Sequence, residues 1–460
     1  MNLHFLDRIQ SKLNEFDFFW TINVEKSQNI GITSYNDEVE KIKYSNNMGL
    51  SVSLNDFKRK KFFVETINDS FDVKKFIQKL DSSAKKLDSI DINSLNINDN
   101  IVNDSFKTDY KINPKDIDFE EKKDLCLNTS SNIDNYNSRF SYIEKIGKKK
   151  IINSFGSNVD FNQNRMLINL SLKKRDNNNE IQNYSARRAY QCGYEIVNSV
   201  DQMIDEAKNG INDLLVADSI NGGKYNVVLD GELNGVFMHE ALGHASEADL
   251  VLSGDSCLSN SLGKKIAPDH ITLHENPTPK SLWGSYQADD DGFSVSDNKI
   301  IDNGVMNTFI SNLDSKKRLK RDHNISTKLT GNSRRESFGY PTQVRMSNTY
   351  LEKGDYSKEE LLEEIKNGFY LKGSSGGQVD TSKGTFQFST DYGYLVENGE
   401  IKKPVKNISF GGRTLDVLNS IEKISNKYEN GMAGFCGKGG QSVPTGGNNP
   451  SVFVKNMLIG

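Results

Sequence analysis

Cysteine, histidine and proline are scarce in this sequence, and it contains no long apolar run. The four cysteines among 460 residues lie far apart with no paired spacing, so we expect no disulfide framework and a reducing compartment. No apolar run approaches the roughly 20 residues that span a bilayer. Charged residues interrupt every turn of residues 1–20, unlike a signal peptide. The protein is therefore expected to be cytoplasmic, with no membrane partner.

An excess of charge of one sign is also lacking. The chain carries 58 basic and 62 acidic residues, for a formal net charge of −4. Its densest basic runs, residues 58–61 and 316–321, are short. Short runs are typical of a solvated surface rather than of a nucleic-acid footprint. We expect no nucleic-acid partner.

The apolar pattern predicts an α+β protein. Helical spacing occurs at residues 3–15, 72–88, 193–216 and 357–368. The last of these segments opens with Ser357 and Glu360 in capping-box positions. Between residues 20 and 70, short strand-like segments separated by Asn, Ser and Gly predict an antiparallel meander. Further strands are expected around residues 139–145, 149–156 and 164–173.

The turn Asn221-Gly222-Gly223 marks the predicted boundary between two domains. Residues 1–220 are expected to combine helices with an antiparallel sheet. Residues 221–460 are expected to be β-rich, with a buried strand at 225–230 that leads into a short helix. Residues 89–113 have the weakest periodicity and predict a long loop or a poorly ordered insert. The three aspartates within residues 287–300 lack the alternate spacing of a calcium loop and predict a turn.

Two of the six histidines flank a glutamate in the segment His239-Glu240-Ala241-Leu242-Gly243-His244. The pattern is one residue longer than the H-E-x-x-H of common zinc peptidases. In an α-helix, positions five apart point about 140° away from each other. Gly243 therefore predicts that the helix kinks, ends, or loosens into a π-turn that returns both imidazoles to one side. If zinc binds there, Glu240 is placed as the general base; the alternative is two ordinary helix histidines.

A catalytic zinc site usually has three protein ligands, and the third is open at this point. Candidates near the motif are Glu247, Asp249, His270 and His274. Cys436 is a more distant candidate, in a glycine-rich stretch where the backbone can approach a ligand closely.

Two further segments are candidates for substrate binding. Gly376, Gly377 and Gln378 precede the alternating segment TFQFST, whose edge could take up an extended peptide by β-strand addition. A plain hairpin with a glycine bulge is the alternative. Arg334 and Arg335 could position substrate, or could form ion pairs within the protein.

Four segments form a series of motifs in the second half of the chain: GVFMHEALGHASEADLVLSG at 235–254, GNSRRESF at 331–338, GGQVD at 376–380 and GFCGKGGQSVP at 434–444. In this order they resemble the TldD/PmbA metallopeptidases, specifically the catalytic, TldD-like branch. The resemblance covers about residues 225–460. Before residue 190 it is limited to the order of helices and strands and to NNMGLSVSL at 46–54.

The resemblance implies that His239 and His244, on a short, kinked helix, bind Zn²⁺ together with Cys436 from far downstream, with Glu240 as the base. It also implies a peptidase that acts on unfolded or short peptides, within a homodimer or a heterodimer with a non-catalytic paralogue. The contrasting hypothesis is a TldD-like subunit that binds or matures peptides with a partner and has no turnover of its own. Retention of Glu240 favours the enzyme.

Overall fold

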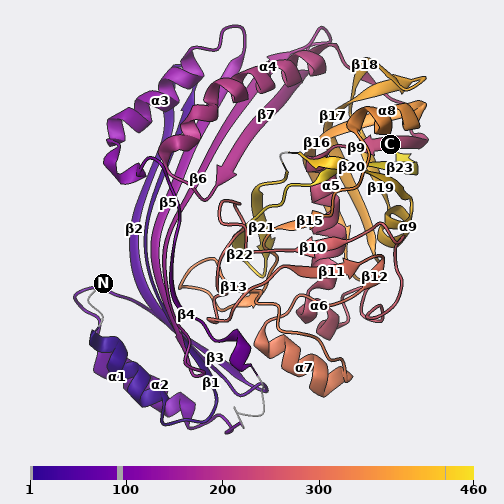
Figure 1. The fold of residues 1–460 in the computed structure, drawn as a ribbon. Coiled ribbons are helices and arrows are strands. Elements are labelled where there is room, and N and C mark those ends of the chain that lie inside the picture. Colours follow the sequence, from indigo (N-terminus) through magenta and orange to yellow (C-terminus); the bar gives the residue numbers. More distant parts are fainter. Residues whose placement is uncertain (1–3, 91–96, 430) are drawn as a thin grey trace.

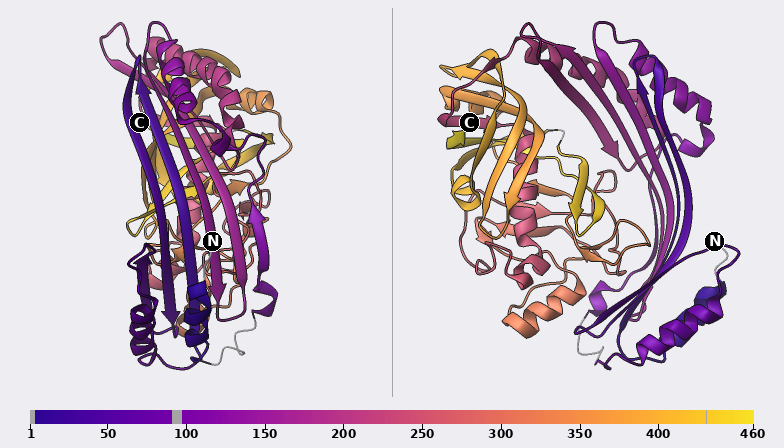
Figure 2. Two further views of the ribbon diagram at one scale, coloured as in Figure 1. Left: turned by 90° about the vertical axis from the view of Figure 1, so that its left-hand side faces the viewer. Right: turned by 180° about the vertical axis from the view of Figure 1, so that it is seen from behind.

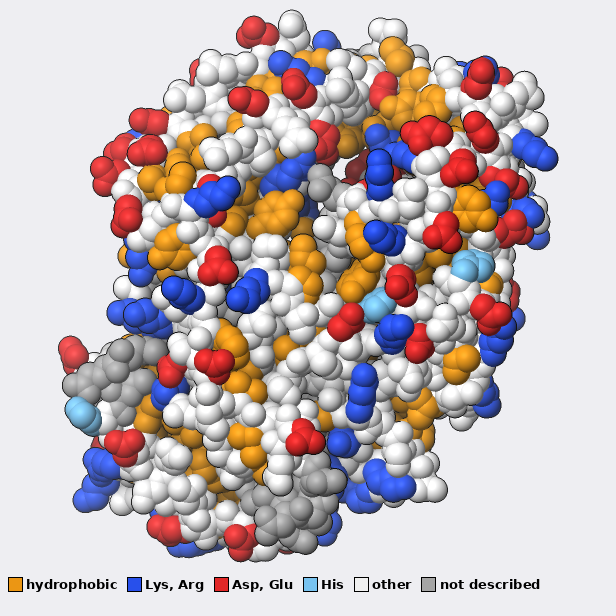
Figure 3. Space-filling view, viewed as in Figure 1, with side chains coloured by type: hydrophobic (Ala, Val, Ile, Leu, Met, Phe, Trp, Pro, Cys, Tyr) orange, Lys and Arg blue, Asp and Glu red, His pale blue; other side chains and the backbone are white. Residues whose placement is uncertain are grey.

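Two large β-sheets, one in each half of the chain, organise the computed structural model, which describes residues 4–90, 97–429 and 431–460. The predicted α+β class is confirmed. Figure 1 shows the long strands of the N-terminal half curving around the C-terminal half. On the face drawn in Figure 3, acidic and basic side chains are interspersed. None of the described helices is long and apolar enough to span a bilayer.

The N-terminal sheet has seven strands. They are β1 (Phe19–Tyr35), β2 (Glu38–Asn55), β3 (Lys60–Thr66), β4 (Asn103–Lys107), β5 (Asn137–Asn153), β6 (Asn158–Arg175) and β7 (Ile181–Tyr190). Their order is β3-β2-β1-β5-β6-β4, and β7 also pairs with β6. The β4–β6 pair is parallel, and the other pairs are antiparallel. The predicted meander is present as β1, β2 and β3.

These strands are longer than the sequence pattern predicted. The break expected near residue 37 is present as the turn between β1 and β2, but those expected near residues 28, 47–48 and 146–148 are wrong. β1 is hydrogen-bonded to β2 on one side and to β5 on the other over nearly its whole length. Two complete ladders keep the polar stretch 26–29 extended, although its residues have low strand propensity.

The two faces of this sheet have different neighbours. Trp20 and Val24 of β1 face the helical side, whereas Glu25 accepts a hydrogen bond from the amide of Phe338 in the C-terminal half. The helices pack on the outer, convex side (Figure 2). They are α1 (His4–Leu13), α2 (Val73–Ala84), α3 (Phe119–Ser131) and α4 (Val200–Val216). The sheet is therefore buried on both faces, and simple alternation is lost in β1.

The C-terminal sheet has eight strands. They are β8 (Asp218–Ser219), β9 (Gly223–Leu229), β16 (Asn367–Asp380), β17 (Thr385–Glu397), β18 (Glu400–Lys406), β19 (Ser409–Arg413), β20 (Ile421–Tyr428) and β23 (Pro450–Ile459). An additional pairing of β16 with β17 closes β16-β9-β23-β19-β17 into a ring. β8, which precedes the predicted boundary at residue 220, pairs with β18 of this sheet; the boundary itself stays a prediction.

Shorter elements surround this ring. The strands are β10 (Leu273–Glu275), β11 (Asn298–Asp302), β12 (Val305–Met306), β13 (Ser333–Arg334), β14 (Gln343–Val344), β15 (Thr349–Leu351), β21 (Gly434–Lys438) and β22 (Gln441–Thr445). The helices are α5 (Gly231–Phe237), α6 (Ala248–Ser253), α7 (Leu313–His323), α8 (Lys358–Ile365) and α9 (Thr414–Asn419). The capping box of α8 is formed as predicted. Helices α7 and α9 were not predicted: α7 is dominated by charged residues and buries only two apolar side chains, Leu313 and Leu319, and α9 has only six residues.

Two segments, residues 89–113 and 289–291, contact the opposite half of the chain. Within residues 89–113, positions 91–96 lie outside the described residues, but β4 pairs with β6, so the expectation of a loop throughout is wrong. Asp289–Asp291 form the predicted turn, yet all three are buried. Asp290 pairs with Lys149, and the carbonyl of Asp291 accepts a hydrogen bond from Asn153. The turn thus joins the C-terminal half to β5.

A buried ion pair between α3 and β5 generates the first prediction. Lys122 Nζ lies 2.9 Å from Glu144 Oε2, and both side chains are at most 3% exposed. Replacing Lys122 with Met leaves the carboxylate buried without its cation, so we expect a loss of about 3 kcal/mol or more in the free energy of unfolding. Urea denaturation measures this. Adding Glu144→Leu should restore most of the loss.

The matched control is Lys123→Met at the next position, where the pair with Glu120 is on the surface and its removal should have far less effect. A Lys122→Met variant as stable as the wild type would contradict the assigned role of the buried pair.

Candidate metal centre

The candidate metal centre lies where the α-helix α5 is continued by a π-helical turn. The buried strand residues Val227–Leu229 lead into α5, whose N-cap Asp230 accepts a hydrogen bond from the amide of Leu233. From Met238 to Gly243 the helix continues as a π-helix, and the amide of His244 bonds to the carbonyl of His239 five residues back. Of the three forms of break that the spacing predicted, the π-turn is the one formed. It brings positions 239 and 244 to one side.

Gly243 is needed for a close approach at this turn. A β-carbon on Gly243 would lie 2.1 Å from the sulfur of Met346, well inside van der Waals contact. Met346 is fully buried, and its neighbour Arg345 is also fully buried. The small residue therefore lets the segment 345–346 pack against the π-turn.

Arg345 connects this segment to the cysteine. Its guanidinium donates to the carbonyl oxygens of Cys436 and Gln441, which lie on the paired strands β21 and β22. These bonds fix the hairpin against the π-turn. Arg345 was not among the residues singled out in the sequence, because its contact with position 436 spans 91 residues.

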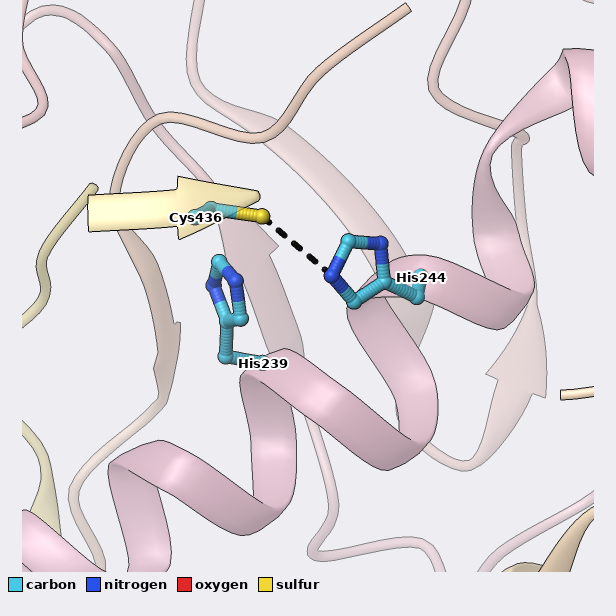
Figure 4. A group of neighbouring side chains, drawn as sticks. All are labelled: His239, His244 and Cys436. Atoms are coloured by element: carbon cyan, nitrogen blue, oxygen red, sulfur yellow. Dashed lines mark hydrogen bonds between the residues drawn. The ribbon is translucent and has the colours of Figure 1, made fainter. Parts of the chain in front are cut away.

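His239, His244 and Cys436 come together at this point. One potential ligand atom from each lies within 4.8 Å of the other two, and Cys436 Sγ is 3.3 Å from His244 Nε2. Figure 4 shows the cysteine on its strand directed toward both imidazoles on the helix. His239 Nδ1 is buried and has no hydrogen-bond partner among the described residues. The arrangement has the donor types of a catalytic zinc site.

A carboxylate orients the second histidine. His244 Nδ1 lies 2.9 Å from Glu247 Oε2, and this contact leaves Nε2 directed at Cys436. Lys438 Nζ contacts Glu247 at 3.0 Å and Asp249 at 2.8 Å. Carboxylate–histidine pairs of this kind fix the tautomer of a metal-binding imidazole. Glu247 and Lys438 are thus site residues whose roles the sequence reasoning missed, although the i,i+3 spacing of 244 and 247 was available as a signal.

The electrostatics of the cluster favour a thiolate. Burial by itself raises the pKa of Cys436, but hydrogen bonds and the charges of His239 and His244 outweigh it and lower the pKa to about 5. Burial likewise opposes protonation of His244, whereas Glu247 and Cys436 raise its pKa well above the usual value. Since a metal ligand must be a thiolate and a neutral imidazole, a cation bound here would release the proton of His244.

The other candidates for a third ligand lie elsewhere or have other partners. His270 Nε2 contacts the carbonyl of Ile421, and His274 Nδ1 contacts Asp297. Asp249 pairs with Lys438. Among these alternatives only Glu247 contacts a residue of the cluster, through His244 Nδ1, the ring nitrogen that is directed away from Cys436.

A cavity of about 970 Å³ opens onto the cluster and is lined by His239, Glu240 and Cys436. Glu240 is partly exposed, and its Oε2 lies 3.6 Å from His244 Nε2. Asp230 and Glu232, at the start of α5, line the same cavity. Burial raises the pKa of Asp230 to about 6. The wall of the cavity therefore becomes more negative as pH rises through about 6 and Asp230 loses its proton.

The predicted substrate residues divide between two places. Gly376 and Gly377 line the cavity, and Gln378 lies next to them on the exposed part of β16. They form a hairpin with β17 that has a bulge between Ser374 and Gly376. The structure does not bring Arg334 and Arg335 to this cavity. Both are buried and line another cavity, where Arg335 donates to Ser51 and to the carbonyl of Asp290.

Comparison with known proteins agrees with this class of site. Residues 222–460 match the model of the PmbA/TldA metallopeptidase C-terminal domain, and residues 112–215 match that of its central domain. A metalloprotease of Methanocaldococcus jannaschii is 36% identical over 446 residues, 96% of each chain. The chain belongs to the TldD/PmbA metallopeptidase family, as the sequence motifs predicted.

Other similar proteins extend the comparison. A zinc metalloprotease TldD homolog of Saccharolobus solfataricus is 38% identical over 279 residues, 59% of each chain. In fold, the chain resembles TldE from Thermococcus kodakarensis, with a TM-score of 0.74, 17% identity and 99% of each chain covered. It also resembles a candidate modulator of a DNA gyrase from Thermotoga maritima, with a TM-score of 0.80, 19% identity and 100% of each chain covered.

The position of Cys436 generates the second prediction. Changing Cys436 to Ser replaces a thiolate by a neutral hydroxyl, so we expect the affinity for zinc to fall by a factor of ten or more (about 1.4 kcal/mol or more), measured by competition with a chromophoric chelator. Cys257→Ser is the matched control, since Cys257 lies outside the cluster. Equal zinc affinity in the two variants would remove Cys436 from the site.

Proposed function

We propose that this protein is a zinc-dependent peptidase that hydrolyses unfolded or short peptides. The observation that carries the proposal is the convergence of His239, His244 and Cys436 within 4.8 Å, from segments about 190 residues apart, at the wall of a large cavity. The metallopeptidase family of the chain supports the same reaction class.

The donor set fits zinc. In a tetrahedral site, a ligand sulfur and a ligand nitrogen lie roughly 3.4–3.7 Å apart, close to the 3.3 Å between Cys436 Sγ and His244 Nε2. The lowered pKa of Cys436, which favours the thiolate, fits a cation bound beside the two imidazoles. When bound, zinc supplies Lewis acidity and lowers the pKa of a coordinated water.

Glu240 is assigned as the general base. It follows the first histidine directly, its carboxylate is partly exposed to the cavity, and it lies next to His244 Nε2. It is therefore within reach of a water at the cluster, from which it accepts a proton, and it can return that proton to the leaving amine.

An open strand edge is assigned as the peptide-binding surface. Beyond Leu371, the described part of β16 pairs only with β17. Residues 373–377 of this strand line the cavity that holds the metal centre. A peptide added to the free edge would be held through its main chain, with little dependence on its sequence, as suits an enzyme acting on unfolded chains.

A second candidate is a TldD-like subunit that binds or matures peptides with a partner and has no turnover of its own. The fold shared with TldE from Thermococcus kodakarensis, at 17% identity, is compatible with either function. Incubation of the zinc-loaded protein with a peptide library, with and without chelator, separates the two functions: chelator-sensitive products support the enzyme, and peptide binding without products supports the subunit.

The third prediction concerns Glu240→Gln. The amide keeps the shape of the side chain but cannot accept the proton, so we expect hydrolysis to fall at least 100-fold while the zinc content stays at the wild-type value. Peptide turnover and metal analysis measure the two effects. Loss of zinc from this variant would make Glu240 a ligand, and substantial turnover would remove it as the base.

The fourth prediction is an assembly of at least two chains in the cytoplasm, where the four free cysteines would stay reduced. The partner is a second copy or a non-catalytic paralogue. If the partner is a second copy, light scattering on the pure protein should give at least twice the chain mass of 51.7 kDa. If the partner is a paralogue, the larger mass should be measured only after the paralogue is added. A fully active monomer would contradict the prediction.

A further inference from the structure

A smaller cavity of about 80 Å³ lies between the N-terminal sheet and the C-terminal half. Its walls include Lys148 of β5, Arg165 of β6, and Arg334 and Arg335 of the loop region that contains β13. It shares no lining residue with the cavity of the metal centre. A cavity that holds one buried water has a volume of about 10–15 Å³. A cavity of about 80 Å³ is therefore large enough for a small polyatomic ion.

The walls of this cavity carry an excess of positive charge. Three acidic side chains line it, Glu25, Asp290 and Glu336, and Asp290 already pairs with Lys149. The basic side chains are Lys145, Lys148, Lys149, Arg165, Arg334 and Arg335. Three positive charges therefore have no acidic counterpart in the wall.

Two of the arginines lack a carboxylate partner among the described residues. Arg165 donates to the carbonyl oxygens of Trp283 and Ser285, at 3.2 Å and 2.9 Å, and to Gln163 Oε1 at 3.2 Å. Arg334 donates to the carbonyl of Met346 and lies 4.9 Å above the ring of Tyr286. Burial, and then the charge of Arg334, lower the pKa of Arg165 to about 10. Two enclosed guanidinium groups that repel each other are costly unless an anion accompanies them.

Arg335 adds a third guanidinium group to the same wall. Arg335 is 7% exposed, and its Nε is buried with no hydrogen-bond partner among the described residues. Its other two nitrogens bond to Ser51 and to the carbonyl of Asp290, so the side chain is held in place. Arg335 therefore adds a fixed positive charge to the wall, beside the two arginines that lack a carboxylate partner.

We propose that this cavity binds a small multivalent oxyanion, of the phosphate or sulfate class, between Arg165, Arg334 and Arg335. Guanidinium groups match the oxygen geometry of such ions and form charge-assisted hydrogen bonds with them. An ion of charge two or more offsets most of the surplus in the wall, which a water molecule or a neutral ligand does not. The anion would lie between β5 and β6 of the N-terminal sheet and the loops of the C-terminal half, and would stabilise their contact.

Isothermal titration calorimetry with inorganic phosphate, at constant ionic strength in chloride buffer, tests the proposal. We expect one phosphate per chain and a rise in the melting temperature that chloride does not reproduce. Arg165→Gln should weaken phosphate binding about tenfold or more. Lys148→Gln, at an exposed position that leaves the fold intact, should weaken it by a smaller factor. Arg139→Gln, at an exposed arginine of the same β5 strand, is the matched control and should bind as the wild type does.

Two further titrations test where the phosphate binds and which anions the cavity accepts. Phosphate binding should persist in Cys436→Ser, and its loss there would place the ion at the metal centre and overturn the proposal. Sulfate should compete with phosphate, whereas acetate should compete far more weakly. Absence of binding in the wild type, equal binding by the Arg165→Gln and Lys148→Gln variants, or tighter binding of acetate would each overturn it.

Discussion

The five-residue spacing between His239 and His244 is the constraint on which the candidate site depends. On a continuous α-helix the two imidazoles would point apart, and no side-chain rotation could bring them to one ion. The π-turn at Met238–Gly243 removes this conflict. It is possible only because Gly243 leaves room for Met346. A change of helical winding therefore decides whether these residues form one site or two unrelated surface positions.

The rest of the C-terminal half places the sulfur of Cys436 opposite this turn. Arg345 ties the hairpin of Cys436 to the segment that packs on Gly243. Lys438, two residues beyond the cysteine, closes the network through Glu247 to His244. Each of these contacting side chains is buried or partly buried. A shift in any one of them would therefore move the sulfur of Cys436 or the imidazole of His244. The open edge of β16 then lies along the wall of the cavity that the centre faces.

Much of this could be predicted from the sequence, because local rules govern it. The helix break at Gly243, the capping box of α8 and the antiparallel meander follow from spacing and local propensity. What failed depended on distant partners. The strand breaks were wrong because ladders on both sides of β1 hold its polar stretch extended. Arg334 and Arg335 lie away from the metal centre, and only the packing of the N-terminal sheet against the C-terminal half reveals where.

The central claim is that one metal ion is held jointly by the π-turn and the hairpin. X-ray absorption at the zinc edge of the loaded protein tests it most directly, since sulfur and nitrogen ligands differ in scattering and distance. The account predicts one zinc per chain with a single sulfur at about 2.3 Å and nitrogen or oxygen ligands at about 2.0–2.1 Å. A first shell without sulfur would contradict it, because Cys436 would then lie outside the centre.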